Sequence, residues 1–128
     1  MTEFGGAVDN AVLGALRESV GDDPEFLGEL VDAFLQDAPA QLESLREAAS
    51  SGDATTARRA AHTLKGNSLT FGARKLASLC QDAESAASAD DLTAVLSRFD
   101  EVDAEWSRVG AELLAWREGS GPASRPTR

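Results

Sequence analysis

The sequence of 128 residues has few of the residues that carry disulfide, metal or aromatic-rich chemistry. It contains one cysteine, Cys80, so no disulfide can form within the chain, and a zinc site built on several thiols is excluded. It contains one histidine and no Glu-x-x-His pair, which argues against a di-iron type of metal bundle. Tyrosine is absent and aromatic residues make up 5% of the chain, whereas alanine and leucine dominate, which favours helices over sheets.

Positive charge and long apolar runs are also scarce. Twelve basic residues face 22 acidic ones, and the formal net charge is −10, so we expect neither nucleic acid nor an anionic membrane as a partner. No run reaches the length of a membrane span or of a signal-peptide core. The lone cysteine and the lack of such a signal together predict a cytoplasmic location.

The apolar residues that are present recur at spacings of three and four, and no strand-like alternation appears. The longest apolar pattern near the start predicts a helix, the second along the chain, from a cap at Asp22 or Asp23 to about residue 50. Pro39 should kink this helix rather than end it. The other helices are expected at 8–20, 54–71, about 76–87 and 92–116.

Short connections between long amphipathic helices predict antiparallel neighbours. The fold class that we expect is all-α: an antiparallel up-down four-helix bundle with a short additional N-terminal helix. Residues 8–118 would form this domain, after a flexible N-terminus (1–7) and before a disordered C-terminal tail (119–128) that is rich in Gly, Ser and Pro.

The single histidine, His62, falls on the outer face of the predicted third helix. At about 100° per residue, the residues opposite to it are those that should face the core: Ala57, Ala60, Leu64, Ser68 and Phe71. The residues on its own side are Thr55, Arg58, Arg59, Lys65, Gly66 and Leu69. His62 is therefore predicted to point to solvent, at the centre of a basic stripe.

The neighbours of His62 favour a reactive histidine over an incidental surface one. Gly66 lies one turn further on the same face, and a glycine inside a helix costs roughly 1 kcal/mol relative to alanine but leaves room for another molecule to approach. Lys65 is close enough to pair with phosphoryl oxygens on the imidazole. No Asp or Glu occurs from Ala54 to Gln81, which predicts a local positive patch suited to a phosphoryl group and an acidic partner.

The string AAHTLKGNSLTFGARKLASLCQDAE resembles the signature of histidine phosphotransfer (HPt) domains of bacterial two-component phosphorelays. The matching positions are His62, Thr63, Leu64, Lys65, Gly66, Asn67, Ser68 and Gly72, and the similarity extends over about residues 9 to 116. Asn67 departs from the pattern, because the family often has serine or another small residue there. At about 140° from His62, Asn67 should border the core and alter helix packing rather than chemistry.

The resemblance implies a phosphocarrier rather than an enzyme. His62 would accept a phosphoryl group from the aspartyl phosphate of a receiver domain, on the nitrogen remote from the backbone, and pass it to another receiver. Lys65 would stabilise the phosphoryl group and Gly66 would give clearance for docking. The docking contacts would come from Arg58, Arg59, Leu69 and Gly72.

We expect no cofactor or metal on this chain, because it lacks a Gly-rich nucleotide loop, a Walker lysine motif and a carboxylate cluster beside His62. The Mg²⁺ ion is expected on the receiver, which would be a response regulator or a hybrid histidine kinase. The protein itself is expected to be a monomer. Two alternatives stay open: an adaptor bundle that binds a receiver or kinase without phosphorylation, and the phosphorylated domain of a larger chemotaxis-type kinase.

Overall fold

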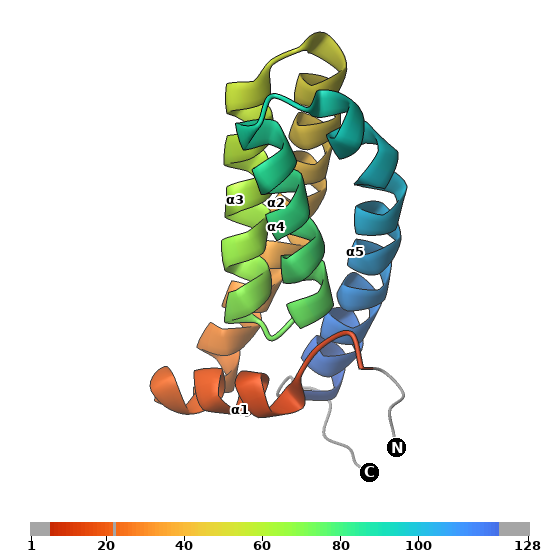
Figure 1. Cartoon of the computed structure of the whole chain (residues 1–128). Coiled ribbons are helices and arrows are strands. Elements are labelled where there is room, and N and C mark those ends of the chain that lie inside the picture. The colour runs from red at the N-terminus through yellow and green to blue at the C-terminus, as the bar shows by residue number, and fades with distance from the viewer. Residues whose placement is uncertain (1–5, 22, 121–128) are drawn as a thin grey trace.

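The computed structural model describes residues 6–21 and 23–120, and this part of the chain is helical (Figure 1). It contains five helices and, within the described residues, no strand, so the predicted all-α class is confirmed. The helices are α1 (Asn10–Ser19), α2 (Pro24–Ser51), α3 (Ala54–Thr70), α4 (Arg74–Ser88) and α5 (Leu92–Ser120).

The four longer helices lie side by side, and α1 crosses one end of them (Figure 1). Helix α3 packs against α2 and α4, and α5 packs against the same two helices from the other side. Each long helix therefore has two helical neighbours and one outer face. The outer face of α3 is the surface on which the candidate site lies.

Short polar sequences set the ends of the helices. The carboxylate of Asp23 accepts hydrogen bonds from the first backbone N–H groups of α2, as the sequence predicts, and the carboxylate of Asp53 caps α3 by accepting from the Thr56 N–H. Gly52 ends α2 in the left-handed region at φ +85°, a conformation that glycine adopts without strain. Helix α2 continues through Pro39, which confirms that this proline does not end it.

The core is built mainly from alanine, leucine and valine side chains, and it includes one aromatic cluster. Phe34 of α2 stacks on Phe71 at 5.0 Å between ring centroids and meets the edge of Trp106 of α5 at 5.1 Å. Cys80 is fully buried, as expected for a core residue, and burial raises the pKa of its thiol to about 12. It is therefore protonated and unreactive at neutral pH.

Both predicted domain boundaries require correction. The N-terminal segment was expected to be flexible through residue 7, but Ala7 is buried and its N–H donates to Glu112 Oε2 at 3.1 Å, while that of Val8 donates to Oε1 at 3.0 Å. At the other end, α5 extends to Ser120, two residues into the predicted tail. The remainder of both predicted segments, 1–5 and 121–128, lies outside the described residues.

A hydrogen bond and an ion pair join the start of α1 to the turn between α3 and α4. The Asp9 N–H donates to the Gly72 carbonyl at 2.9 Å, and the Asp9 carboxylate lies 2.9 Å from the Arg74 guanidinium. Gly72 has φ +78°, and a Cβ at this position would lie 2.9 Å from both the Asp9 carbonyl oxygen and Val12 Cβ. The motif glycine therefore lets the chain turn tightly beneath α1.

Candidate functional site

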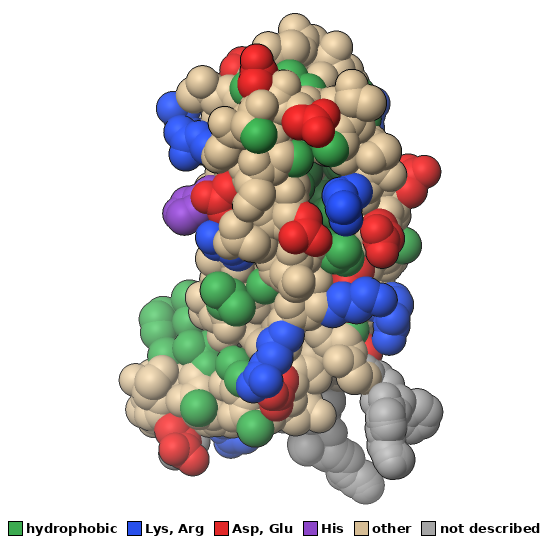
Figure 2. Space-filling model, in the orientation of Figure 1, with side chains coloured by type: hydrophobic (Ala, Val, Ile, Leu, Met, Phe, Trp, Pro, Cys, Tyr) green, Lys and Arg blue, Asp and Glu red, His purple; other side chains and the backbone are tan. Residues whose placement is uncertain are grey.

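His62 projects from the outer face of α3. Its side chain is 64% exposed, and the ring protrudes from the molecule with acidic and basic side chains beside it (Figure 2). The residues predicted on the opposite side of the helix (Ala57, Ala60, Leu64, Ser68 and Phe71) are all buried. The helical placement of His62 derived from the sequence is therefore confirmed.

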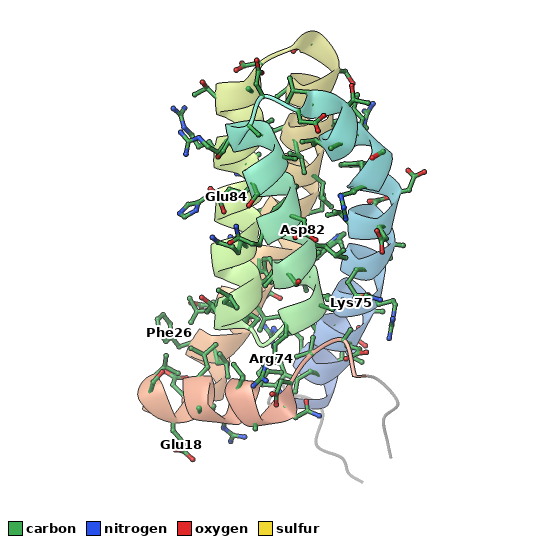
Figure 3. All side chains as sticks on the ribbon, in the orientation of Figure 1. Glu18, Phe26, Arg74, Lys75, Asp82 and Glu84 are labelled. Carbon is green, nitrogen blue, oxygen red and sulfur yellow. The ribbon has the colours of Figure 1, made fainter. Side chains whose placement is uncertain are left out.

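Glu84 of α4 is hydrogen-bonded to the imidazole ring at Nδ1. Its Oε2 lies 2.9 Å from His62 Nδ1, and Figure 3 shows Glu84 reaching from α4 toward the outer side of α3. An ionised carboxylate can only accept a hydrogen bond, so in the neutral ring Nδ1 carries the proton and donates a hydrogen bond to Glu84. The Nε2 atom is then left unprotonated, with its lone pair available to another molecule.

Lys65 lies on the far side of the same carboxylate. Its ammonium is 2.8 Å from Glu84 Oε1, in an ion pair that lacks the angles of a hydrogen bond. It also donates to Gln81 Oε1 at 2.9 Å, and its side chain is 23% exposed. Lys65 is the main cause of a lowered pKa at Glu84. Burial opposes that shift, and the hydrogen bond from His62 adds to it.

Gln81 completes this set of contacts, which we call the α3–α4 network: His62, Lys65, Gln81, Glu84 and Ser85. The Gln81 Nε2 donates to Ser85 Oγ at 3.0 Å, so the amide is held at both ends. The network joins α3 to α4 through polar side chains at the position where the histidine emerges. It fixes the ring orientation and puts a negative charge beside Nδ1.

Gly66 leaves the surface next to His62 open. A Cβ built at Gly66 would have nothing within 4 Å outside its own helix, so this glycine is not required by a close contact within the protein. One turn beyond it, Leu69 is 55% exposed. A hollow of about 270 Å³ lies beside Leu69, lined by Lys65, Leu69, Arg74, Ala77, Ser78 and Gln81.

On the α2 side of α3 the surface below the histidine is apolar. Phe26, near the start of α2, is 45% exposed, and Figure 2 shows apolar side chains gathered between the histidine and α1. Phe26 points outward from the end of α2 (Figure 3). A second hollow of about 200 Å³ lies between α2 and α3, and Asn67 is one of its lining residues. Asn67 is half-buried, which fits its predicted place at the border of the core.

The predicted positive patch is weaker than the sequence suggests. Three of the five basic residues in the acid-free stretch meet acids from other elements: Lys65 meets Glu84, Arg74 meets Asp9, and Lys75 lies 4.0 Å from the buried Glu105. Arg58 and Arg59 remain exposed on α3. The stretch without acids is continuous in sequence, but folding brings carboxylates from elsewhere against it.

Gly72 does not fit the partner contact that the sequence interpretation assigned to it. The residue is buried, and α1 covers it through Asp9 and Val12. Its presence in the motif reflects the turn that it allows rather than a surface that it offers.

Glu84 and Gln81 were missed by the sequence interpretation. They are separated from His62 by 22 and 19 residues, and only the packing of α4 on α3 brings them to it. A weak signal exists in the sequence: Cys80 and Ala83 lie on the buried stripe, so Gln81 and Glu84 are each one residue beyond it. That position would place both polar side chains at the edge of a helix interface.

The described residues form neither a metal-binding cluster nor a membrane-spanning helix. In residues 6–21 and 23–120, no group of three or more His, Cys, Asp or Glu side chains is arranged to hold a metal ion. Within the same ranges, no helix has the length and apolar character needed to cross a membrane.

Comparison with known proteins identifies the family. The Hpt domain family matches residues 29–112, a range that includes the whole α3–α4 network. Among solved structures, the chain is similar to the crystal structure of histidine-containing phosphotransfer protein B (HptB) from Pseudomonas aeruginosa PAO1. The TM-score is 0.79 at 31% sequence identity, over 87% of this chain and 94% of that one. No curated protein sequence matches the chain.

The family explains the arrangement described above, because HPt domains are phosphocarriers that interact with receiver domains. The chain belongs to the Hpt domain family, and its role is histidine phosphotransfer in a phosphorelay.

Proposed function

We propose that His62 is the residue that carries the phosphoryl group, and that Nε2 is the atom that bears it. The observation that supports this most directly is the contact between Nδ1 and Glu84, which leaves Nε2 as the free nucleophile on a 64% exposed ring. The Cys80 thiol is buried, so it does not compete for the phosphoryl group.

In the transfer step, the lone pair of Nε2 attacks the phosphorus of an aspartyl phosphate on the receiver. The N–P bond forms as the bond from phosphorus to the aspartyl oxygen breaks, and the aspartate leaves as a carboxylate. Positive charge develops on the imidazole ring, which keeps its proton on Nδ1. The Glu84 carboxylate, 2.9 Å from Nδ1, stabilises that charge without taking the proton, as the carboxylate of a catalytic triad does.

Lys65 and Gly66 serve the phosphoryl group and the docking partner. The Lys65 ammonium lies beside Glu84 before transfer and can turn to the phosphoryl oxygens after it, since a lysine side chain is flexible. Gly66 leaves space in which the acidic pocket of the receiver can approach Nε2.

The docking surface is proposed to extend from His62 over Leu69 toward Phe26. Both apolar side chains are about half exposed, and exposed apolar groups next to a reactive residue indicate a binding surface. Arg58 and Arg59, on the other side of His62, would steer an acidic receiver into place.

Further proposals concern what surrounds the site. The receiver supplies Mg²⁺ and the acidic pocket, and this chain needs no cofactor. The receivers belong to response regulators or hybrid histidine kinases. The fold is an antiparallel up-down four-helix bundle with one extra helix, acting as a monomer in the cytoplasm.

Phosphoryl transfer from a panel of phosphorylated receiver domains tests these assignments. Wild-type protein should take up label that is lost in acid and survives alkali, while His62→Gln should take up none and unfold at the same temperature as the wild type. Gln36→Leu, at an exposed position of α2, serves as a control that changes a surface glutamine outside the proposed site. Label retained by His62→Gln would contradict the assignment of His62. Tight receiver binding without any transfer would favour the adaptor alternative.

A further inference from the structure

The Lys65 ammonium has two possible sets of partners, and it cannot make the best contacts with both. In the structure it is held on the α4 side by Glu84 Oε1 at 2.8 Å and by Gln81 Oε1 at 2.9 Å. After transfer, the phosphoryl oxygens on His62 would compete for the same three N–H donors. Any contact that exists only before transfer opposes phosphorylation of His62.

Gln81 makes such a contact, and its amide is set up to do so. An ammonium has only donors, so the amide oxygen must face Lys65, and the amide nitrogen then donates to Ser85 Oγ at 3.0 Å. Because its two ends differ in chemistry and both are engaged, the side chain is not free to turn its nitrogen toward Lys65. The interaction joins a neutral acceptor to a charged donor, which is stronger than a contact between neutral groups.

We propose that Gln81 is a positioning residue that holds Lys65 against Glu84 in the unphosphorylated protein and thereby sets how far the phosphoryl equilibrium lies toward His62. The inference rests on the proposed function of His62 and assigns a role to a residue outside the motif. The hydrogen bonds of Gln81 go to Lys65 and Ser85 and not to the imidazole. It acts only through Lys65.

Substitutions of Gln81 should move the equilibrium in opposite directions. Gln81→Leu removes one of the two acceptors that hold Lys65 on the α4 side, so the equilibrium constant for transfer from receiver to His62 should rise about two- to tenfold, the range expected for one hydrogen bond. Gln81→Glu holds the ammonium more tightly and should lower the constant by a similar factor. Gln81 is exposed, so neither change should impair folding.

The experiment is a measurement of phosphoryl partition between this protein and one phosphorylated receiver at equilibrium. Matched controls are Gln36→Leu and Gln36→Glu, the same changes at an exposed position of α2, which should leave the partition unchanged. The decisive comparison is Gln81→Leu in a Lys65→Met background. If Gln81 acts through Lys65, its effect should vanish there, whereas a general structural role would persist.

An unchanged partition in Gln81→Leu, or the same shift with and without Lys65, would overturn the inference while leaving the carrier role of His62 intact. Failure of the proposed function itself would look different. In that case the wild type would take up no phosphoryl group, either from a receiver or from the small-molecule donor phosphoramidate.

Discussion

Replacing Glu84 tests the central contact of the site. Glu84→Ala removes the acceptor for His62 Nδ1–H and also the anion paired with Lys65, whereas Glu84→Gln keeps a neutral acceptor of similar shape. If the carboxylate stabilises the ring as it becomes positively charged, both variants should transfer more slowly, and the alanine variant should be the slower of the two.

The size of the effect follows from the exposure of the two partners. Hydrogen bonds that involve a charged group contribute about 1.5–3 kcal/mol when shielded from solvent. Glu84 is only 16% exposed, but the His62 side chain is 64% exposed, so water weakens the contact toward the lower end of that range. A loss of about 1.4 kcal/mol in the transition state corresponds to roughly a tenfold slower transfer for Glu84→Ala. The decrease in transfer rate for Glu84→Gln should be several-fold smaller than that for Glu84→Ala.

Two measurements check this reasoning. Rapid-quench kinetics with a phosphorylated receiver give the transfer rate, and ¹⁵N NMR of the imidazole gives the position of the proton in the neutral ring. The wild-type ring should carry its proton on Nδ1, and Glu84→Ala should shift the population toward protonation at Nε2. Transfer at the wild-type rate by a variant whose tautomer balance is also unchanged would refute the role of Glu84.

Three further predictions concern stability and docking. Gly66→Ala should raise the free energy of unfolding by about 1 kcal/mol, because nothing obstructs the new Cβ, while slowing transfer; thermal unfolding and transfer kinetics together check it. Gly72→Ala should destabilise the protein by about 1–3 kcal/mol in denaturant unfolding, because φ is +78° and the Cβ would lie 2.9 Å from the Asp9 carbonyl oxygen. Folding lowers the pKa of Glu84 from its ordinary value of 4.5. The stabilising effect of the Glu84 carboxylate should therefore be present above pH 4.5 and be lost as the pH falls through the lower pKa of the folded protein. The difference in unfolding free energy between wild type and Glu84→Gln should shrink accordingly, and a difference that grows in acid would contradict the sign.

The sequence predicts the placement of His62 well because helical geometry is a local property. Once residues 54–71 are assigned to one helix, the angle between His62 and Leu64 follows from the number of residues per turn. The buried and exposed faces of α3 therefore agree with the prediction, and the cap at Asp23 does so for the same reason. Each of these features depends on residues that are close together in the chain.

The partners of His62 could not be predicted in the same way, because they depend on how two helices lie against each other. A shift of α4 by one turn along α3 would move Glu84 about 5.4 Å and separate it from Nδ1. The periodicity of α4 fixes its buried stripe but not that register. The assignment of Gly72 failed for a related reason: the sequence shows that the glycine opens a turn but not that α1 covers it.

The exposure of the α3–α4 network suits a carrier that must both accept and release a phosphoryl group. Water weakens charged contacts at an exposed site, so each contact around His62 can favour one state of the ring by only about 1–2 kcal/mol. A deeply buried carboxylate would stabilise the positively charged ring more strongly and make the phosphorylated form a poorer donor to the next receiver. The proposed carrier therefore keeps its nucleophile oriented by Glu84 while leaving the ring 64% exposed, so that the incoming receiver supplies most of the charge that drives transfer.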